Sequence, residues 1–274
     1  MTDQPEFEVG RKQWESERKF FDDLAAKAPD FQLDKVSARY DAAMAAPLFP
    51  LEAAYALMGD VRGKRVLDVG CGNGENSLLF ARWQAEVTGV DISAGSIAVC
   101  KQRAKMNGIG ANATFIETPF ELVSKNQAPY DIIWSAAFLH HVLDRLDEVA
   151  KIFESLLKPD GFVLFLEPVR FSPILKKIRR FIPPFPEATP DERPLERSDI
   201  AVLEQTFEIV DRRLFGPVSR IADRWGAQVL YEQATPAQKR RANNMMKLDR
   251  EVMRLRCFES TAMIMVAKLR LRRN

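Results

Sequence analysis

The sequence of 274 residues is poor in the residue types that build cross-links and metal centres. It contains three cysteines, two histidines and no Cys-x-x-Cys pair. An odd number of scattered cysteines argues against a disulfide framework and is typical of proteins from a reducing compartment. A structural zinc site needs a cluster of sulfur and imidazole ligands, so the sequence predicts no bound metal.

Long apolar runs and an excess of one charge are also missing. No stretch reaches about 18 consecutive apolar residues, so no helix is expected to span a bilayer. The first ten residues are polar and acidic, unlike a signal peptide, and the expected location is the cytoplasm. The 40 Lys and Arg residues nearly balance the 38 Asp and Glu residues, so the chain has no global attraction for nucleic acid or for an anionic membrane.

From residue 65 onward, short apolar runs alternate with amphipathic stretches. The expected strands are 65–69, 86–90, 113–116, 130–134 and 162–166. The expected helices between them are 75–83, 94–107 and 145–157, and a turn is expected at 158–161. This alternation is typical of an α/β fold with a doubly wound, mostly parallel sheet, in which ligands bind beyond the carboxyl ends of the strands.

The rest of the chain departs from this rhythm. Residues 1–58 are expected to form an N-terminal helical cap, and 59–274 the main domain. Residues 197–215 predict one helix and one strand, and a closing strand is expected around 258–269. Two lid-like inserts, the second a helical pair, are expected after the fifth and sixth strands, at about 169–195 and 216–256.

The strongest motif is Asp68-Val-Gly-Cys-Gly-Asn-Gly74, which follows a predicted strand and opens a predicted helix. Its glycines let the backbone turn sharply and approach a ligand closely. The Gly-Lys-Ser/Thr ending of a phosphate-binding P-loop is missing, and Glu75 occupies the position of the third glycine of the dinucleotide fingerprint. Because an acid there repels a pyrophosphate, the motif favours a positively charged ligand over NAD.

The second motif, Gly89-Val-Asp-Ile-Ser93, ends the next predicted strand. A carboxylate such as Asp91 can accept hydrogen bonds from both hydroxyls of a ribose, which indicates a nucleoside without identifying it. The alternative role is capping of the following helix, for which Ser93 is the better candidate.

Four further segments complete a set with these two motifs: Tyr130-Asp-Ile-Ile-Trp-Ser135, Leu139-His-His-Val142, Leu157-Lys-Pro-Asp-Gly161 and Glu167-Pro168. Over roughly residues 60–170, the set resembles the class I S-adenosylmethionine-dependent methyltransferases. The resemblance implies a seven-stranded sheet with an antiparallel last strand. It also implies S-adenosylmethionine as methyl donor, S-adenosylhomocysteine as product, and a donor site formed by Asp68, Gly70, Cys71, Gly72, Gly74, Asp91, Ile92, Glu117, Thr118, Phe120 and Ser135.

One position departs from the family's pattern. After the third strand the family often carries an acid whose side chain meets the adenine amino group, and Thr118 occupies that position here. Either the adjacent Glu117 takes this role, or Phe120 packs on the adenine face.

The only two histidines, His140 and His141, follow the fourth predicted strand. An imidazole titrates near neutrality, which suits a general base for a phenol or another hydroxyl. The alternative is that one histidine packs under the next helix while the other binds backbone. Glu167 and Arg170 follow the fifth predicted strand. They are candidates for binding acceptor groups or orienting a histidine, or they form a mutual salt bridge without a chemical role.

The acceptor is expected to be a small organic molecule, methylated at oxygen in preference to nitrogen or carbon. Methylases of exocyclic base amines carry Asn/Asp-Pro-Pro-Tyr/Phe after the fourth strand, which Ser135-Ala-Ala-Phe138 does not resemble, so no stable nucleic-acid partner is expected. Two other function classes stay open: a catalytically silent donor-binding scaffold, and an RNA or protein methylase that uses the basic region 239–256. That region is otherwise a helix that packs on the core or on a second copy in a homodimer.

Residues 173–182 place apolar side chains on one helical face and four basic side chains on the other. The favoured interpretation is a lid over the substrate. The alternative is a peripheral membrane contact, and the two roles coexist if the acceptor is lipid-like or acidic.

Overall fold

The computed structural model describes residues 15, 17–28, 31, 33–43, 45–123, 129–172, 193–216, 218 and 234–272. Contacts divide the chain into two compact units. The first unit is Met1–Ser37, Asp60–Trp134 and Ser155–Gly161, and the second is Ala38–Gly59, Ser135–Glu154 and Phe162–Asn274.

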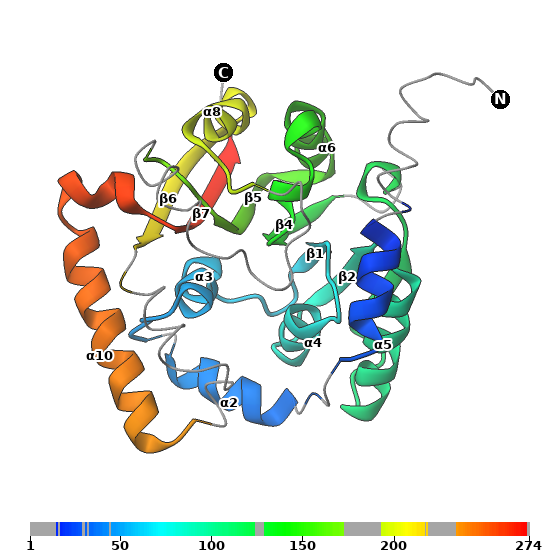
Figure 1. Ribbon diagram of the computed structural model, residues 1–274. Helices are drawn as coiled ribbons and strands as arrows, with labels where there is room; N and C mark the ends of the chain where they lie inside the picture. Colours follow the sequence, from blue (N-terminus) through cyan, green and yellow to red (C-terminus); the bar gives the residue numbers. More distant parts are fainter. Residues whose placement is uncertain are drawn as a thin grey trace. The chain divides into compact units, whose positions relative to one another are not determined.

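Seven strands form one sheet in the order β3-β2-β1-β4-β5-β7-β6 (Figure 1). Strands β1 and β2 are parallel, as are β2 and β3, whereas β7 is antiparallel to both β5 and β6. The strands are β1 Arg65–Val69, β2 Glu86–Asp91, β3 Ala113–Glu117, β4 Tyr130–Ala136, β5 Leu157–Pro168, β6 Phe207–Phe215 and β7 Ile264–Leu271. The expected seven-stranded, mostly parallel sheet with an antiparallel last strand is confirmed.

In the first unit, four of the five residues of β1 are buried, as expected for a strand covered on both faces, and three of the six residues of β2 are buried. Helix α4 (Glu75–Arg82) packs on β1 and β2, and α5 (Ala94–Met106) packs on β2 and β3. The hydroxyl of Ser93 caps α5 by accepting a hydrogen bond from the Ser96 amide at 2.9 Å, which confirms the predicted cap. A further helix covers residues 17–25.

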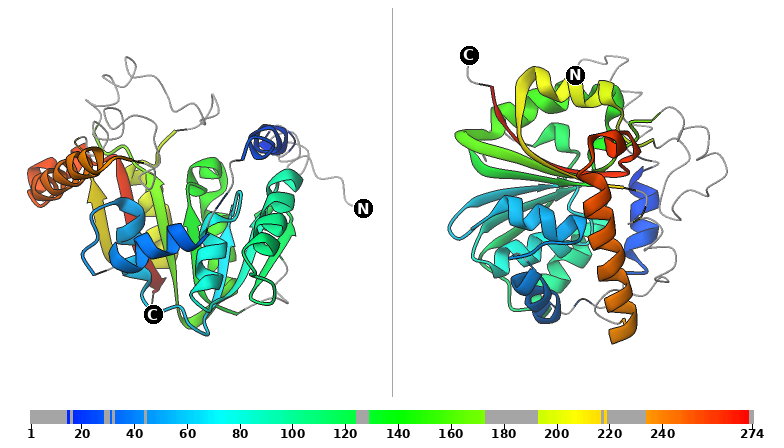
Figure 2. Two further views of the ribbon diagram at one scale, coloured as in Figure 1. Left: turned by 90° about the horizontal axis from the view of Figure 1, so that it is seen from below. Right: turned by 90° about the vertical axis from the view of Figure 1, so that its left-hand side faces the viewer.

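In the second unit, α3 (Pro50–Met58) and α8 (Arg197–Thr206) lie on opposite faces of β6 and β7 (Figures 1 and 2). Helix α10 (Pro236–Met253) packs on β6 through buried Met246 and Asp249, so core packing is one role of the basic C-terminal region. Further elements in the described ranges are α2 Leu33–Ala43, α6 Leu146–Leu156 and the 3-10 helices η1 Phe120–Leu122, η3 Leu139–His141, η4 Leu143–Arg145 and η7 Arg256–Thr261.

Two predicted boundaries are wrong. The expected turn at 158–161 is instead the first part of β5. There the Lys158 ammonium lies 2.8 Å from the Asp131 carboxylate of β4, so the segment is held extended within the first unit. The expected strand start at 258 is also wrong, because η7 occupies 256–261, where the Thr261 hydroxyl donates to the Phe258 carbonyl at 2.7 Å.

Several expectations lie outside the described residues. These include the lid or membrane helix at 173–182, most of the first insert, and the first half of the predicted helical pair in the second insert. Within the described ranges, every helix is too short or too polar to traverse a lipid bilayer.

Candidate active site

The glycine loop between β1 and α4 turns through left-handed backbone at three positions. The φ angles are 64° at Gly70, 50° at Gly72 and 78° at Gly74, which only glycine adopts without strain. Gly74 is also confined by packing, because a Cβ there would lie 2.8 Å from the Cys100 Sγ of α5. The sharp turns that the motif predicted are therefore present.

Asp91, the last residue of β2, ties the loop to the neighbouring strand. One carboxylate oxygen accepts from the Gly72 amide at 2.8 Å, and the other accepts from the Ser93 amide at 2.9 Å. Burial raises the pKa of Asp91, although these backbone hydrogen bonds oppose the shift. Each oxygen keeps a further lone pair, so Asp91 can still accept hydrogen bonds from ligand hydroxyls.

Asp68 lies deeper, at the end of β1. The residue is only 2% exposed, and its carboxylate accepts a 2.5 Å hydrogen bond from the Ser77 hydroxyl of α4. Burial raises the pKa of Asp68 to about 7. The structure thus gives Asp68 a role in holding the start of α4, and its contact with a ligand stays a prediction.

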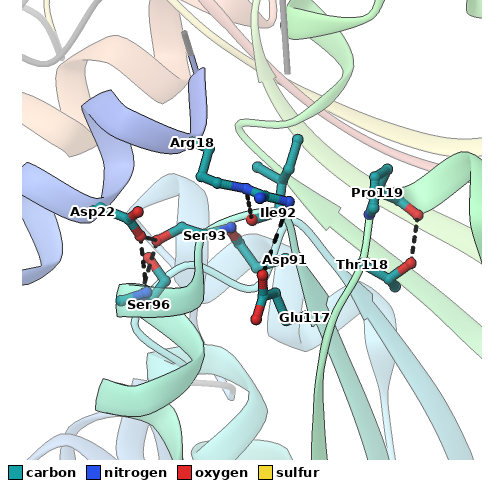
Figure 3. Close-up of polar contacts among 10 residues, drawn as sticks. Arg18, Asp22, Asp91, Ile92, Ser93, Ser96, Glu117, Thr118 and Pro119 are labelled. Atoms are coloured by element: carbon teal, nitrogen blue, oxygen red, sulfur yellow. Dashed lines mark hydrogen bonds and ion pairs between the residues drawn. The ribbon is translucent and has the colours of Figure 1, made fainter. Parts of the chain in front are cut away.

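The predicted adenine side is at the ends of β2 and β3 (Figure 3). The Ile92 carbonyl accepts a hydrogen bond from Arg18, and the Glu117 carboxylate lies 3.8 Å from the same guanidinium. The Thr118 hydroxyl donates to the Pro119 carbonyl at 3.2 Å, and Phe120 is 4% exposed within η1. Glu117 thus adds a second acidic side chain to this edge, beside Asp91, and the choice between Glu117 and Phe120 as the adenine contact stays a prediction.

In the second unit, Glu167 of β5 organises the segment that follows β4. This fully buried carboxylate accepts hydrogen bonds from the Phe138 and Leu139 amides, at 2.8 and 2.7 Å, through one oxygen. Its other oxygen lies 2.7 Å from Nδ1 of His140. The His141 ring packs against that of His140, with centroids 4.3 Å apart. Glu167 therefore holds both a backbone turn and one of the two histidines.

Arg170 does not pair with Glu167. Its guanidinium lies 2.5 Å from the Glu196 carboxylate, so the predicted alternative of a mutual salt bridge between Glu167 and Arg170 is wrong. The physical reason is that the Glu196 carboxylate takes the Arg170 guanidinium, while two backbone amides and His140 hold the carboxylate of Glu167. Binding of an acidic acceptor group by Arg170 stays a prediction.

A family model described as a methyltransferase domain matches residues 60–206, which is more than half of the chain. The chain belongs to the class I S-adenosylmethionine-dependent methyltransferases. The donor of this family is S-adenosylmethionine, as the motif set implied.

Two curated relatives of this methyltransferase are both named ubiquinone biosynthesis O-methyltransferase. The one from Bordetella avium is 36% identical over 118 residues, which cover 42% of this chain and 47% of the relative. The one from Actinobacillus pleuropneumoniae is 37% identical over 108 residues, which cover 38% of this chain and 45% of the relative. The chain thus spans somewhat less than half the length of these relatives.

Solved structures similar to the methyltransferase share its fold. A cyclopropane synthase from Mycobacterium tuberculosis has a TM-score of 0.55 and 17% identity, and the match covers 80% of this chain and 82% of that one. Magnesium protoporphyrin IX methyltransferase from Synechocystis PCC 6803, solved with bound S-adenosylhomocysteine, has a TM-score of 0.51 and 16% identity, with 97% and 94% covered. At these identities the likeness shows the fold alone.

The residues of the methyltransferase's first unit fit the donor. Among the described residues other than its two chain neighbours, none has an atom within 4 Å of the place where a Cβ on Gly72 would be, so the loop leaves open space at its central turn. Among the described residues, the buried Asn73 Oδ1 has no hydrogen-bond partner and can accept from a ligand. With the acceptor capacity of Asp91, these groups match a ligand that carries an ammonium group and ribose hydroxyls.

Two residues that support the donor loop were missed by sequence reasoning. The Cys100 thiol donates to the Gly72 carbonyl at 3.1 Å, and the Arg103 guanidinium donates to the Asn73 carbonyl at 3.0 Å. Arg103 also pairs with Glu75 at 3.3 Å. Cys100 and Arg103 are three positions apart in the predicted helix 94–107 and therefore share one helical face. This spacing was the one feature of the sequence that could have indicated their shared role.

Ser135 and Cys71 complete the set of predicted donor residues. The Ser135 Oγ is buried and has no hydrogen-bond partner within the ranges that the structure describes, and Cys71 is 7% exposed. Their contacts with the donor stay predictions. No group of three or more His, Cys, Asp or Glu side chains that could hold a metal ion is found among the described residues.

Proposed function

We propose that this methyltransferase transfers a methyl group from S-adenosylmethionine to a hydroxyl oxygen of a small organic acceptor. In this proposal His140 is the general base and Glu167 is the residue that positions it. The observation that carries the proposal is the 2.7 Å contact between His140 Nδ1 and the buried Glu167 carboxylate. The name of the curated relatives, O-methyltransferase of ubiquinone biosynthesis, supports an oxygen acceptor.

Bound S-adenosylmethionine supplies an electrophilic methyl group, whose bond to sulfur breaks as the bond to the acceptor oxygen forms. The protein must take the proton that the hydroxyl loses. An ionised Glu167 requires a proton on Nδ1 of His140, which leaves the lone pair on Nε2. Nε2 is thus the atom that accepts the hydroxyl proton, and general-base catalysis of this kind contributes about 10²–10⁴-fold to a rate.

The geometry favours His140 over His141 for this task. Glu167 is locked by two backbone amides, so its second oxygen presents a fixed acceptor to one imidazole only. The His140 side chain is 11% exposed, so competing water has limited access to it. We assign His141 to packing against the His140 ring.

The substitution Glu167→Gln tests the proton assignment. The glutamine oxygen still accepts from the two backbone amides, but the glutamine amide donates to Nδ1 and forces the proton onto Nε2. We expect kcat to fall on the order of 10²–10⁴-fold, as for other catalytic histidines held in the wrong tautomer. The affinity for S-adenosylhomocysteine, measured by isothermal titration, is expected to stay unchanged.

The assay measures S-adenosylhomocysteine formed from a panel of phenols, catechols and matched amines. His140→Ala is expected to lose activity as Glu167→Gln does, whereas the matched control His141→Ala retains most of it. Full activity of both Glu167→Gln and His140→Ala would contradict the role of His140 as general base. Turnover of amines but of no hydroxyl compound would contradict the oxygen acceptor.

The finer expectations stay predictions. They are a lipid-like or acidic acceptor, a homodimer, a cytoplasmic location and enclosure of the acceptor by the helical cap and the inserts. The alternative of a donor-binding scaffold predicts S-adenosylhomocysteine binding without turnover of any compound. The alternative of an RNA or protein methylase predicts polynucleotide or peptide binding with a steep salt dependence, lost when basic residues of 239–256 are replaced.

A further inference from the structure

The helix over residues 17–25 lies beside the ends of β2 and β3 in the first unit, and its contacts there have no role in the proposed proton transfer (Figure 3). We propose that this helix completes the donor site, and that Arg18 binds the nucleoside part of S-adenosylmethionine. The inference rests on the donor site of the proposed function and adds a residue to it.

Arg18 reaches across two segments that are predicted to hold the nucleoside. Its Nε donates to the carbonyl oxygen of Ile92 at 3.1 Å, directly after the ribose-binding candidate Asp91. Its Nη2 lies 3.8 Å from the Glu117 carboxylate, at the end of β3. Figure 3 shows the Arg18 side chain extending from the helix over the loop after β2 toward Glu117. The guanidinium thus spans the predicted ribose and adenine positions.

The contacts of Arg18 leave it able to bind a ligand. A guanidinium has five N–H groups, and within the described part of the chain Nη1 of Arg18 has no partner. The side chains of Arg18 and Glu117 are each 45% exposed, and an ion pair with that exposure contributes little to stability. Asp91 accepts hydrogen bonds and Arg18 donates them, so the two are complementary to ribose hydroxyls and adenine ring nitrogens.

Asp22, one helical turn after Arg18, fixes where the helix lies. Its Oδ1 accepts from the Ser93 hydroxyl at 2.6 Å and from the Gly95 amide at 2.8 Å. A carboxylate is favourable there because the N-terminus of α5 carries partial positive charge. A Cβ on Gly95 would lie 3.0 Å from that oxygen and 3.3 Å from the Asp22 Cα. The glycine at 95 therefore permits the close approach that places Arg18.

The test measures Kd by isothermal titration for S-adenosylhomocysteine and for 5′-methylthioadenosine, which lacks the amino-acid part. Arg18→Ala is expected to weaken both ligands by a similar factor of about tenfold, because a hydrogen bond from a charged group is lost. Gly95→Ala is expected to weaken both as well by displacing Asp22, although alanine favours α5 itself. The matched control is Lys19→Ala, an exposed cation on the same helix that is expected to leave both Kd values unchanged.

Unchanged affinity of Arg18→Ala for both ligands overturns the inference. A loss confined to S-adenosylhomocysteine overturns it too, because Arg18 would then act at the amino-acid end. An equal loss in Lys19→Ala would show a general charge effect and would also overturn it. None of these titrations requires turnover, so each of these results leaves methyl transfer through His140 intact. Failure of the unaltered chain to bind S-adenosylhomocysteine would instead overturn the proposed function.

Discussion

The carboxyl group of Asp68 makes the free energy of unfolding depend on pH in a direction that the structure determines. The residue is 2% exposed, and burial raises its pKa from the ordinary 3.8 to about 7. Between these two values the folded state holds one proton more than the unfolded state. The stabilisation that this proton provides is therefore complete below pH 3.8 and is lost as the pH rises to about 7.

The substitution Asp68→Asn removes this dependence without removing the acceptor for the Ser77 hydroxyl. A shift of about three pKa units corresponds to about 4 kcal/mol, since one unit is about 1.4 kcal/mol. We expect the asparagine variant to gain up to about that amount relative to the unaltered protein between pH 4 and pH 8. The difference between the two proteins is expected to be small at the acid end, where both side chains are neutral.

Urea unfolding of both proteins at a series of pH values measures this difference. The signal is the fluorescence of Trp134, which is fully buried in β4, together with that of the other tryptophans. Parallel curves of unfolding free energy against pH for the two proteins would refute the reasoning, because they would show that an ionised Asp68 carries no penalty. A gain in unfolding free energy of Asp68→Asn at low pH, and none at high pH, would show that the direction of the predicted pH dependence is wrong.

Two further substitutions test packing around the donor loop and at helix α10. Gly74→Ala is expected to lower the unfolding free energy by about 1–3 kcal/mol, because its φ is 78° and the new Cβ would lie 2.8 Å from Cys100 Sγ. Calorimetric melting should show a lower Tm for this variant. Gly110→Ala, whose new Cβ would have no described neighbour within 4 Å, should keep the Tm of the unaltered protein, and equal Tm values for the two variants would contradict this account. The buried Gly216 amide donates a 2.8 Å hydrogen bond to the Asp249 carboxylate. Asp249→Ala removes this acceptor and is expected to lower the free energy of unfolding in urea by about 1–3 kcal/mol. Asp249→Asn, which keeps an acceptor, should lose less, and an equal loss in both would contradict the role of this hydrogen bond.

Much of the fold could be predicted because its signals are local in sequence. The apolar runs that form β1 to β4 and the glycines at 70, 72 and 74 depend on residues within a few positions of one another. The turn expected at 158–161 shows where local chemistry fails. Pro-Asp-Gly favours a turn, but the ion pair of Lys158 with Asp131, 27 residues away, holds the segment in the sheet.

The partners within the candidate site were harder to predict because they are far apart in sequence. Orientation of a histidine was one of several roles that the sequence left open for Glu167, and only the folded chain shows that its carboxylate contacts His140. The contacts of the helix over 17–25 join residues more than 70 positions apart, and no spacing rule connects Arg18 to Ile92 or Asp22 to Gly95. Long-range pairing of this kind follows from the topology of the strands and not from any motif.

The antiparallel position of β7 has a consequence for how the chain is completed during synthesis. Among the described strands, β6 pairs with β7 alone, and β7 also pairs with β5. The strand formed by residues 207–215 must therefore wait for residues 264–271 to leave the ribosome before it gains this partner in the sheet. Meanwhile β1, β2 and β3 already have theirs. Nascent chains that lack the final strand would thus present an unpaired edge, the feature that invites aggregation.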